Sequence, residues 1–306
     1  MKKLLLAAIT AAMLFTFSTA PAQEKVVVTS FYPIYILTRN LTVGIEDIQV
    51  ENLAAPDTGC LHDYQLLTGD MRTLARAQAL LVNGAGMESY LDTVAAQFPG
   101  LQVADASIGI PLLDGLGENE HTHEEGEEGH DHEDNAHIWL DVKNAKAMVE
   151  NLRDGLQSAF PEHKDAFAQN AAAYLARLDA LDAELKAGLE NLQRREIITF
   201  HEAFPYFAKA YGLHVAAVVN REPGEALSPA QLAELVQLVK TLDAPPLFTE
   251  PQYPDLAART LAAETGAKVY ELDPLVTGPM DEGALWAYED GMRKNMQVLR
   301  LALGGI

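Results

Sequence analysis

Short apolar runs alternate with amphipathic stretches in two successive series along the chain. In the first series we predict strands at 26–31, 48–54, 79–82 and 101–104, with helices after Pro33 and at 70–77 and 87–98. In the second we predict strands at 196–200, 215–219, 246–249 and 268–272, with helices at 203–211, 228–242, 255–265 and 284–303. Because parallel strands need a crossover, and a helix usually provides it, this alternation predicts mostly parallel sheets flanked by helices. The expected fold class is therefore α/β, with two lobes.

One long amphipathic stretch, residues 164–193, separates the two series. Leucines recur there at every third or fourth position from Leu175 to Leu192, with charged residues between them. As a helix it would be ~40 Å long at ~1.5 Å per residue. A coiled-coil partner helix is an alternative, but the central position in the chain favours a bridge between lobes. We therefore predict a first lobe over 23–160, a linker helix over 161–193 and a second lobe over 194–306.

The first 22 residues have the pattern of a secretory signal peptide. Lys2 and Lys3 precede an apolar run from Leu4 to Phe17, and Ala20-Pro21-Ala22 (20–22) offers the small residues of a cleavage site. The apolar run is too short for a membrane-spanning helix. Because no cysteine lies near the cleavage site, we expect no lipid anchor. The mature chain is expected to be soluble and periplasmic.

The net charge of −22 argues against nucleic acid and anionic membranes as partners, and it suits a protein that gathers cations. Cys60 is the single cysteine, so no internal disulfide can form. It stands two residues before His62, which leaves a thiolate ligand conceivable. A buried, inert cysteine is the more common case.

Residues 117–136 interrupt the α/β pattern. From Glu118 to Asp134 the chain has nine acidic residues and four histidines, and no apolar residue. The four histidines are His121, His123, His130 and His132. Such a segment cannot bury enough surface to offset its ordering entropy, so we expect a disordered loop. The histidines could bind a metal weakly and pass it to a tighter site, or the loop could be a solvated insert only.

Four candidate metal ligands stand at strand ends or in neighbouring loops, two from each half of the chain. His201 and Asp273 end strands of the second series, whereas His62 and His137 lie in loops of the first. Ligands of α/β proteins bind at the carboxyl ends of strands and between lobes. Three neutral imidazoles with a carboxylate or water suit tetrahedral Zn²⁺. Each residue also has a structural alternative, as a loop histidine or, for Asp273, an ordinary turn residue.

Six short pieces of the chain carry a family resemblance by their order and spacing. They are Val-Thr-Ser-Phe-Tyr-Pro (28–33), Leu-His-Asp-Tyr (61–64), Ala-His-Ile-Trp-Leu-Asp (136–141), Phe-His-Glu-Ala-Phe-Pro-Tyr-Phe (200–207), Thr-Glu-Pro-Gln (249–252) and Leu-Asp-Pro-Leu (272–275). Together they resemble the metal-specific solute-binding proteins of ABC importers, the family of zinc and manganese receptors. The resemblance covers the whole mature chain.

The resemblance implies ligand roles for His62, His137 and His201, with Asp273 or a water as the fourth ligand. It also implies two lobes bridged by one rigid helix, limited hinge motion and a membrane permease as partner. At the position of His201 the family's manganese receptors carry Glu, and imidazole there favours zinc. One departure lies before His137, where Asn135-Ala136 (135–136) replaces the usual Asp-Pro of the family.

We therefore expect a monomeric periplasmic receptor that binds Zn²⁺ and delivers it to an ABC importer. A manganese or iron receptor of the same family is the main alternative, and a zinc-binding adhesin or buffer is another. A zinc hydrolase is a third, since Glu202 follows His201. A zincin helix, however, needs His-Glu-x-x-His, and residue 205 is Pro. We expect no enzymatic activity.

Overall fold

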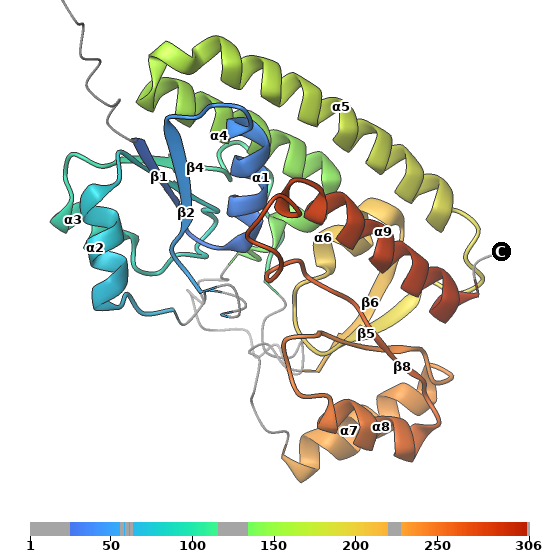
Figure 1. Ribbon diagram of the computed structural model, residues 1–306. Coiled ribbons are helices and arrows are strands. Elements are labelled where there is room, and N and C mark those ends of the chain that lie inside the picture. The colour runs from blue at the N-terminus through green and yellow to red at the C-terminus, as the bar shows by residue number, and fades with distance from the viewer. Residues whose placement is uncertain are drawn as a thin grey trace, which may run out of the picture.

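The computed structural model describes residues 25–55, 58, 61, 64–115, 134–219 and 228–304 of the 306-residue chain (Figure 1). It contains two four-stranded sheets, with strand orders β2-β1-β3-β4 and β6-β5-β7-β8. The first comprises β1 (Lys25–Thr29), β2 (Ile48–Asn52), β3 (Ala79–Val82) and β4 (Gln102–Asp105). The second comprises β5 (Glu196–Thr199), β6 (His214–Val218), β7 (Leu247–Thr249) and β8 (Val269–Glu271). Every pairing within these sheets is parallel, which confirms the predicted α/β fold with two lobes.

Helices cover both faces of the first sheet. They are α1 (Tyr32–Thr42), α2 (Thr68–Arg76), α3 (Leu91–Gln97) and α4 (Val142–Ala159). The central strand β3 is buried along its whole length, and so is β1 after Lys25. Strands buried on both faces read as continuous apolar runs, which is why both were visible in the sequence.

We predicted no helix over Val142–Ala159, although α4 has a clear signal. Its buried residues are Val142, Ala145, Met148, Val149, Leu152 and Leu156, a helical spacing. Asp141 caps the helix by accepting a hydrogen bond from the backbone N–H of Lys143 at 2.8 Å. Gly155 lets α4 approach β4 closely, because a Cβ there would lie 2.3 Å from the Cβ of Ala104.

The long helix α5 (Lys164–Leu189) runs along one side of the molecule from the first lobe to the second (Figure 1). A short 3₁₀ turn, η2 (Pro161–His163), joins it to α4. Its buried residues are Phe167, Ala171, Tyr174, Leu178, Leu181, Leu185 and Leu189. They belong to one hydrophobic core that extends through the first lobe, α5, the inner part of the second lobe and the last helix of the chain.

The second lobe has α6 (Pro205–Tyr211), α7 (Pro229–Thr241), α8 (Leu256–Thr265) and α9 (Ala284–Leu303). Ser228 caps α7 in a capping box with Gln231, as its sequence predicts. Gly212 ends α6 with a φ of 67°, a left-handed conformation that favours glycine. The outer part of this lobe has its own small core, formed by Ile198, Val239, Leu247, Leu261 and Ala267.

Arg177 of α5 ties the two lobes together at the helical side of the molecule. Its guanidinium donates to Asn40 Oδ1 of α1 at 2.9 Å and to Glu289 Oε1 of α9 at 2.7 Å. Tyr32 and Tyr35 of α1 also donate, at 3.1 and 2.9 Å, to backbone carbonyls just before α9. We call this set of contacts the Arg177 clamp. It fixes α1, α5 and α9 to one another.

The prediction of a disordered loop over 117–136 is wrong at its end, because residues 134–136 are ordered. Residues 116–133, and with them the four histidines of the loop, lie outside the described residues, as does the signal peptide. Asp134, however, pairs with Asp114 in an antiparallel bridge, and Asn135 and Ala136 are buried. Asn135 is also held by contacts with Glu202 and Tyr206 of the second lobe, which a local reading of the sequence could not reveal.

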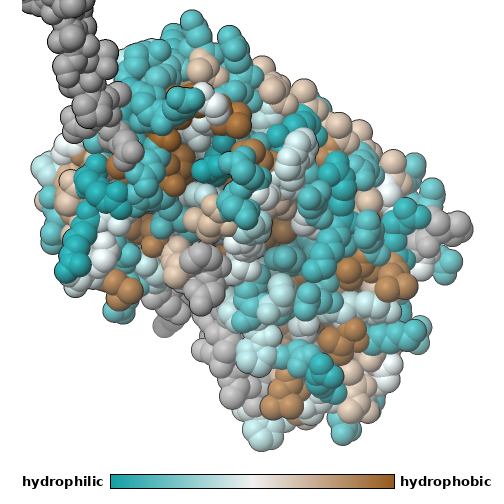
Figure 2. All heavy atoms as spheres, in the orientation of Figure 1, coloured by the Kyte–Doolittle hydropathy of each residue, from teal (hydrophilic) through white to brown (hydrophobic). Residues whose placement is uncertain are grey.

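Figure 2 shows a face covered mostly by hydrophilic residues, with hydrophobic ones scattered among them. Among the helices that the structure describes, each lacks the length or the apolar character needed to cross a membrane.

Candidate metal centre

His137 and His201 meet between the lobes. Their ring centroids are 4.8 Å apart with the planes at 80°, and each residue is only 2% exposed. His201 follows β5, and His137 directly precedes the short helix η1 (Ile138–Leu140). The structure therefore brings together two of the four predicted ligands, one from each half of the chain.

Glu250 orients the ring of His201. The Nδ1 atom lies 3.1 and 3.3 Å from the two carboxylate oxygens of Glu250, which directly follows β7. An ionised carboxylate only accepts hydrogen bonds, so Nδ1 carries the proton and Nε2 keeps its lone pair. Nε2 is buried and has no hydrogen-bond partner among the described residues. A buried lone pair without a partner is costly, and a metal ion would satisfy it.

Asn135 orients the ring of His137 in a comparable way. Its Oδ1 accepts the backbone N–H of His137 at 2.9 Å and lies 3.1 Å from Nδ1 of the ring. Because the backbone donor identifies this atom as oxygen, Nδ1 must also donate. In the neutral ring Nε2 is then the unprotonated nitrogen. In both histidines Nε2 is then the ring nitrogen that carries no proton.

Aromatic rings pack against both imidazoles. Trp139 lies 5.2 Å from His137 and Tyr253 lies 6.1 Å from His201, measured between ring centroids. The indole N–H of Trp139 donates to the backbone oxygen of Pro274 at 2.7 Å. These contacts limit the rotation of the imidazoles and join the surroundings of His137 to the second lobe.

Asp273 is held in a turn at the edge of this region. Its Oδ1 accepts the backbone N–H of Leu275 at 2.8 Å and lies 3.4 Å from the side-chain nitrogen of Gln252. Asn295 of α9 bonds to both backbone groups of Asp273. Across the described ranges, no group of three or more His, Cys, Asp and Glu residues converges as a metal site. The ligand role of Asp273 therefore remains a prediction.

His62 and Cys60 lie outside the described residues, so the structure does not test their predicted places. His163 Nε2 is 3.0 Å from the carboxylate of Asp47, and His214 is exposed at the start of β6.

We did not predict the roles of Glu250 and Asn135. Glu250 had a usable signal, because it follows a strand that neighbours β5, and adjacent parallel strands end at the same edge of a sheet. For Asn135 the only signal in the sequence was its position two residues before His137. Its contact with the second lobe depends on packing between distant parts of the chain.

Glu202, the residue considered as a catalytic base, is 7% exposed and takes part in a contact between lobes. Its backbone oxygen and Oε1 accept hydrogen bonds from the amide nitrogen of Asn135 at 2.9 and 3.3 Å. These bonds give Glu202 a structural role beside the site.

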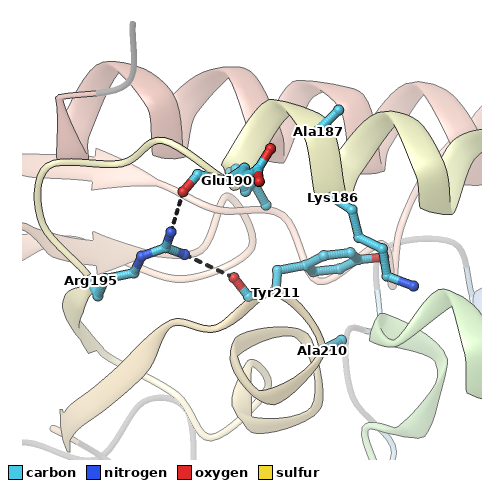
Figure 3. Close-up of a pocket in the computed structure, with 7 residues that line it drawn as sticks. Lys186, Ala187, Glu190, Arg195, Ala210 and Tyr211 are labelled. Carbon is cyan, nitrogen blue, oxygen red and sulfur yellow. Dashed lines mark hydrogen bonds between the residues drawn. The ribbon is translucent and has the colours of Figure 1, made fainter.

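A separate surface pocket of about 440 Å³ lies where α5 meets α6 (Figure 3). It is lined by Lys186, Ala187, Leu189, Glu190, Arg195, Ala210 and Tyr211, and thus by none of the predicted ligands. Arg195 donates to the backbone oxygens of Glu190 and Tyr211, so its charge serves to join the end of α5 to α6 (Figure 3).

Two parallel-sheet lobes, a long bridging helix and paired imidazoles between the lobes define the class of two-lobed metal-binding receptors. The chain belongs to the family described as "Zinc-uptake complex component A periplasmic", which matches residues 27–302.

The zinc-binding lipoprotein AdcA of Streptococcus pneumoniae serotype 4 (strain ATCC BAA-334 / TIGR4) is 34% identical over 279 residues, or 90% of this chain and 55% of the relative. The chain thus spans about half the length of this relative. The high-affinity zinc uptake system protein ZnuA of Bacillus subtilis (strain 168) is 30% identical over 282 residues, or 90% of this chain and 87% of the relative.

Among solved structures, the Zn(II)-bound ZnuA-like domain of Streptococcus pneumoniae AdcA has a TM-score of 0.76 at 28% identity. The match covers 92% of this chain and 99% of that one. A structure of ZnuA has a TM-score of 0.77 at 25% identity, and the match covers 92% of this chain and 99% of that one. These likenesses confirm the family and the fold.

Proposed function

We propose that this protein is a periplasmic receptor that binds Zn²⁺ between its lobes and delivers it to the membrane permease of an ABC importer. The observation that carries the proposal is the pair of buried imidazoles, His137 and His201, from opposite lobes with rings 4.8 Å apart. Nitrogen ligands favour Zn²⁺ over Mn²⁺. The relatives named for zinc binding and zinc uptake support the same cargo.

We propose His62, His137 and His201 as the three imidazole ligands, each binding the metal as a neutral ring. Asp273 or a water would complete a tetrahedral site. Leu61, which directly precedes His62, is fully buried in the core of the first lobe. The receptor performs no chemistry on its cargo.

Metal analysis of the purified protein, followed by competitive titration of the metal-free form with Zn²⁺ and Mn²⁺, tests this proposal. We expect one tight Zn²⁺ site. His137→Ala and His201→Ala should each weaken it by more than roughly 100-fold, beyond the loss typical of a supporting residue. His214→Ala, which removes an exposed histidine of the second lobe, serves as the matched control and should bind like the unaltered protein.

Tighter binding of Mn²⁺ than of Zn²⁺ would contradict the choice of cargo. Unchanged zinc affinity in His201→Ala would contradict the site itself. Hydrolysis of esters or peptides that is lost in His201→Ala would instead indicate a zinc hydrolase.

A further inference from the structure

Asn135 is a buried residue whose carboxamide bonds to both lobes at once. It is 4% exposed. On one side its oxygen accepts the backbone N–H of His137 and faces Nδ1 of the ring. On the other side its nitrogen donates to the backbone oxygen and to Oε1 of Glu202, the residue directly after His201. One side chain therefore links the immediate surroundings of both paired histidines.

The backbone of Asn135 makes a second contact between the lobes. Its N–H donates to the oxygen of Leu113 at 2.8 Å. Its carbonyl accepts the hydroxyl of Tyr206 in α6 at 2.8 Å, and the same hydroxyl accepts the N–H of Leu113 at 2.9 Å. The segment before His137 is thus bonded to α6 of the second lobe as well as to its own lobe.

An amide suits this position because it both donates and accepts hydrogen bonds. A carboxylate would still accept from His137, but it would place a second acceptor against the carbonyl and the carboxylate of Glu202. The resulting repulsion between like charges would oppose the approach of the lobes.

We propose that Asn135 is a positioning residue that couples the approach of the two lobes to the orientation of His137. Its oxygen keeps the His137 ring in the tautomer with Nε2 unprotonated, while its nitrogen holds the second lobe at Glu202. The inference rests on the proposed function, since it takes His137 as a ligand. Closure of the lobes and preparation of the ligand are then one event.

Three single variants and one double variant of the full chain test the proposal. Asn135→Asp keeps the acceptor for His137 and loses the donor to Glu202, whereas Asn135→Ala loses both. Asn170→Asp is the matched control, because the amide of Asn170 likewise donates to two backbone oxygens, of Leu41 and Val43, both at 2.9 Å. Zinc affinity is measured by competition with a chelator, and the His137 tautomer by ¹⁵N NMR of the imidazole in the metal-free protein.

We expect Asn135→Asp and Asn135→Ala to weaken zinc binding by roughly 10- to 100-fold, the usual effect of losing a residue that supports a ligand. Asn170→Asp should bind zinc like the unaltered protein. The Nδ1–H tautomer of His137 should persist in Asn135→Asp and lose its dominance in Asn135→Ala. Adding Glu202→Gln to Asn135→Asp should recover part of the affinity, because the new amide can donate to Asp at 135.

Unchanged zinc affinity in both Asn135 variants would overturn the proposal, as would an unchanged His137 tautomer in Asn135→Ala. If Asn135→Ala does not fold, failure of Glu202→Gln to improve zinc binding by Asn135→Asp would also overturn it. Tight binding in His137→Ala would refute the proposed function itself. Loss of binding in His137→Ala, with normal binding in Asn135→Asp, would refute only the role of Asn135.

Discussion

The two lobes share one sheet architecture, but they support their histidines differently. In the second lobe His201 follows a strand, and the carboxylate of Glu250 in the same lobe orients it. In the first lobe His137 precedes η1, and the neutral amide of Asn135 orients it while bonding to the other lobe. The second lobe thus offers a ligand that its own sheet fixes. The first lobe offers His137, whose orienting residue, Asn135, also bonds to the second lobe.

The cores of the lobes differ as well, and cavity-forming substitutions should expose this difference most strongly. Leu247→Ala removes a buried side chain from the small core in the outer part of the second lobe, whereas Leu81→Ala affects the larger core that the first lobe shares with α5 and the inner part of the second lobe. Each should lower the free energy of unfolding by about 2–5 kcal/mol. Hydrogen exchange should show that Leu247→Ala weakens protection mainly in β5 to β8, since local stability follows local packing.

Leu81→Ala should instead reduce protection in both the first lobe and α5. If the two variants changed exchange in the same segments, the lobes would be one cooperative unit, and the comparison would fail.

Glu88 makes the stability of the first lobe depend on pH. Burial raises the pKa of Glu88 to about 7, even though its oxygens accept the backbone N–H groups of Asn83 and Gly84 at 2.7 and 3.0 Å. In the unfolded chain the pKa is about 4.3, so the folded state binds the extra proton between these values. The stability from Glu88 is complete below the unfolded pKa and is lost as pH rises through about 7, by roughly 3 kcal/mol.

Glu88→Gln should therefore flatten the fall in stability between about pH 4.5 and about pH 7. Urea unfolding of the metal-free protein at several pH values measures this change. Glu271→Gln, at an exposed glutamate of β8, is the control and should retain the fall. If the free energy of unfolding of Glu88→Gln still falls over this pH range, a titratable group other than Glu88 causes the fall.

Glu250→Gln tests the support of the second lobe's histidine. Gln keeps a hydrogen-bond acceptor but removes the negative charge that makes the His201 ring a stronger ligand. Zinc affinity should fall by roughly 10- to 100-fold, equivalent to about 1.4–2.7 kcal/mol. Chelator competition measures the affinity, and small-angle scattering measures the shape of the zinc-loaded form.

Glu250→Gln should lower affinity without changing the zinc-loaded shape, because its contact lies within one lobe. Asn135→Asp should change both. If Glu250→Gln and Asn135→Asp had the same scattering profile and the same zinc affinity, Glu250 and Asn135 would not differ in how they orient the two histidines.

Elements with local signals could be predicted from the sequence. The strand Ala79–Val82 is a continuous apolar run, and Ser228 and Gly212 mark the start of α7 and the end of α6. The helix Val142–Ala159 had the same kind of signal and was missed.

The meeting of His137 and His201 could be predicted, because His201 follows a strand, and ligands of α/β proteins bind at the carboxyl ends of strands and between lobes. The bond from Asn135 to Glu202 could not. It joins residues 67 positions apart in the chain and depends on the exact approach of two lobes.

The Arg177 clamp has a consequence for how the cargo leaves. Glu289 of α9 is 1% exposed, and Arg177 of α5 donates a hydrogen bond to it. Separating α5 from α9 would leave a buried charge without its partner, at a cost of about 3–5 kcal/mol. Release of the metal by a wide opening of the lobes would therefore have a high free-energy cost. For a permease that removes the metal, displacing one loop that carries a ligand would cost less free energy than separating the two lobes. If the proposed function holds, we expect unassisted release of the metal to be slow, and we expect the permease to act locally at the site.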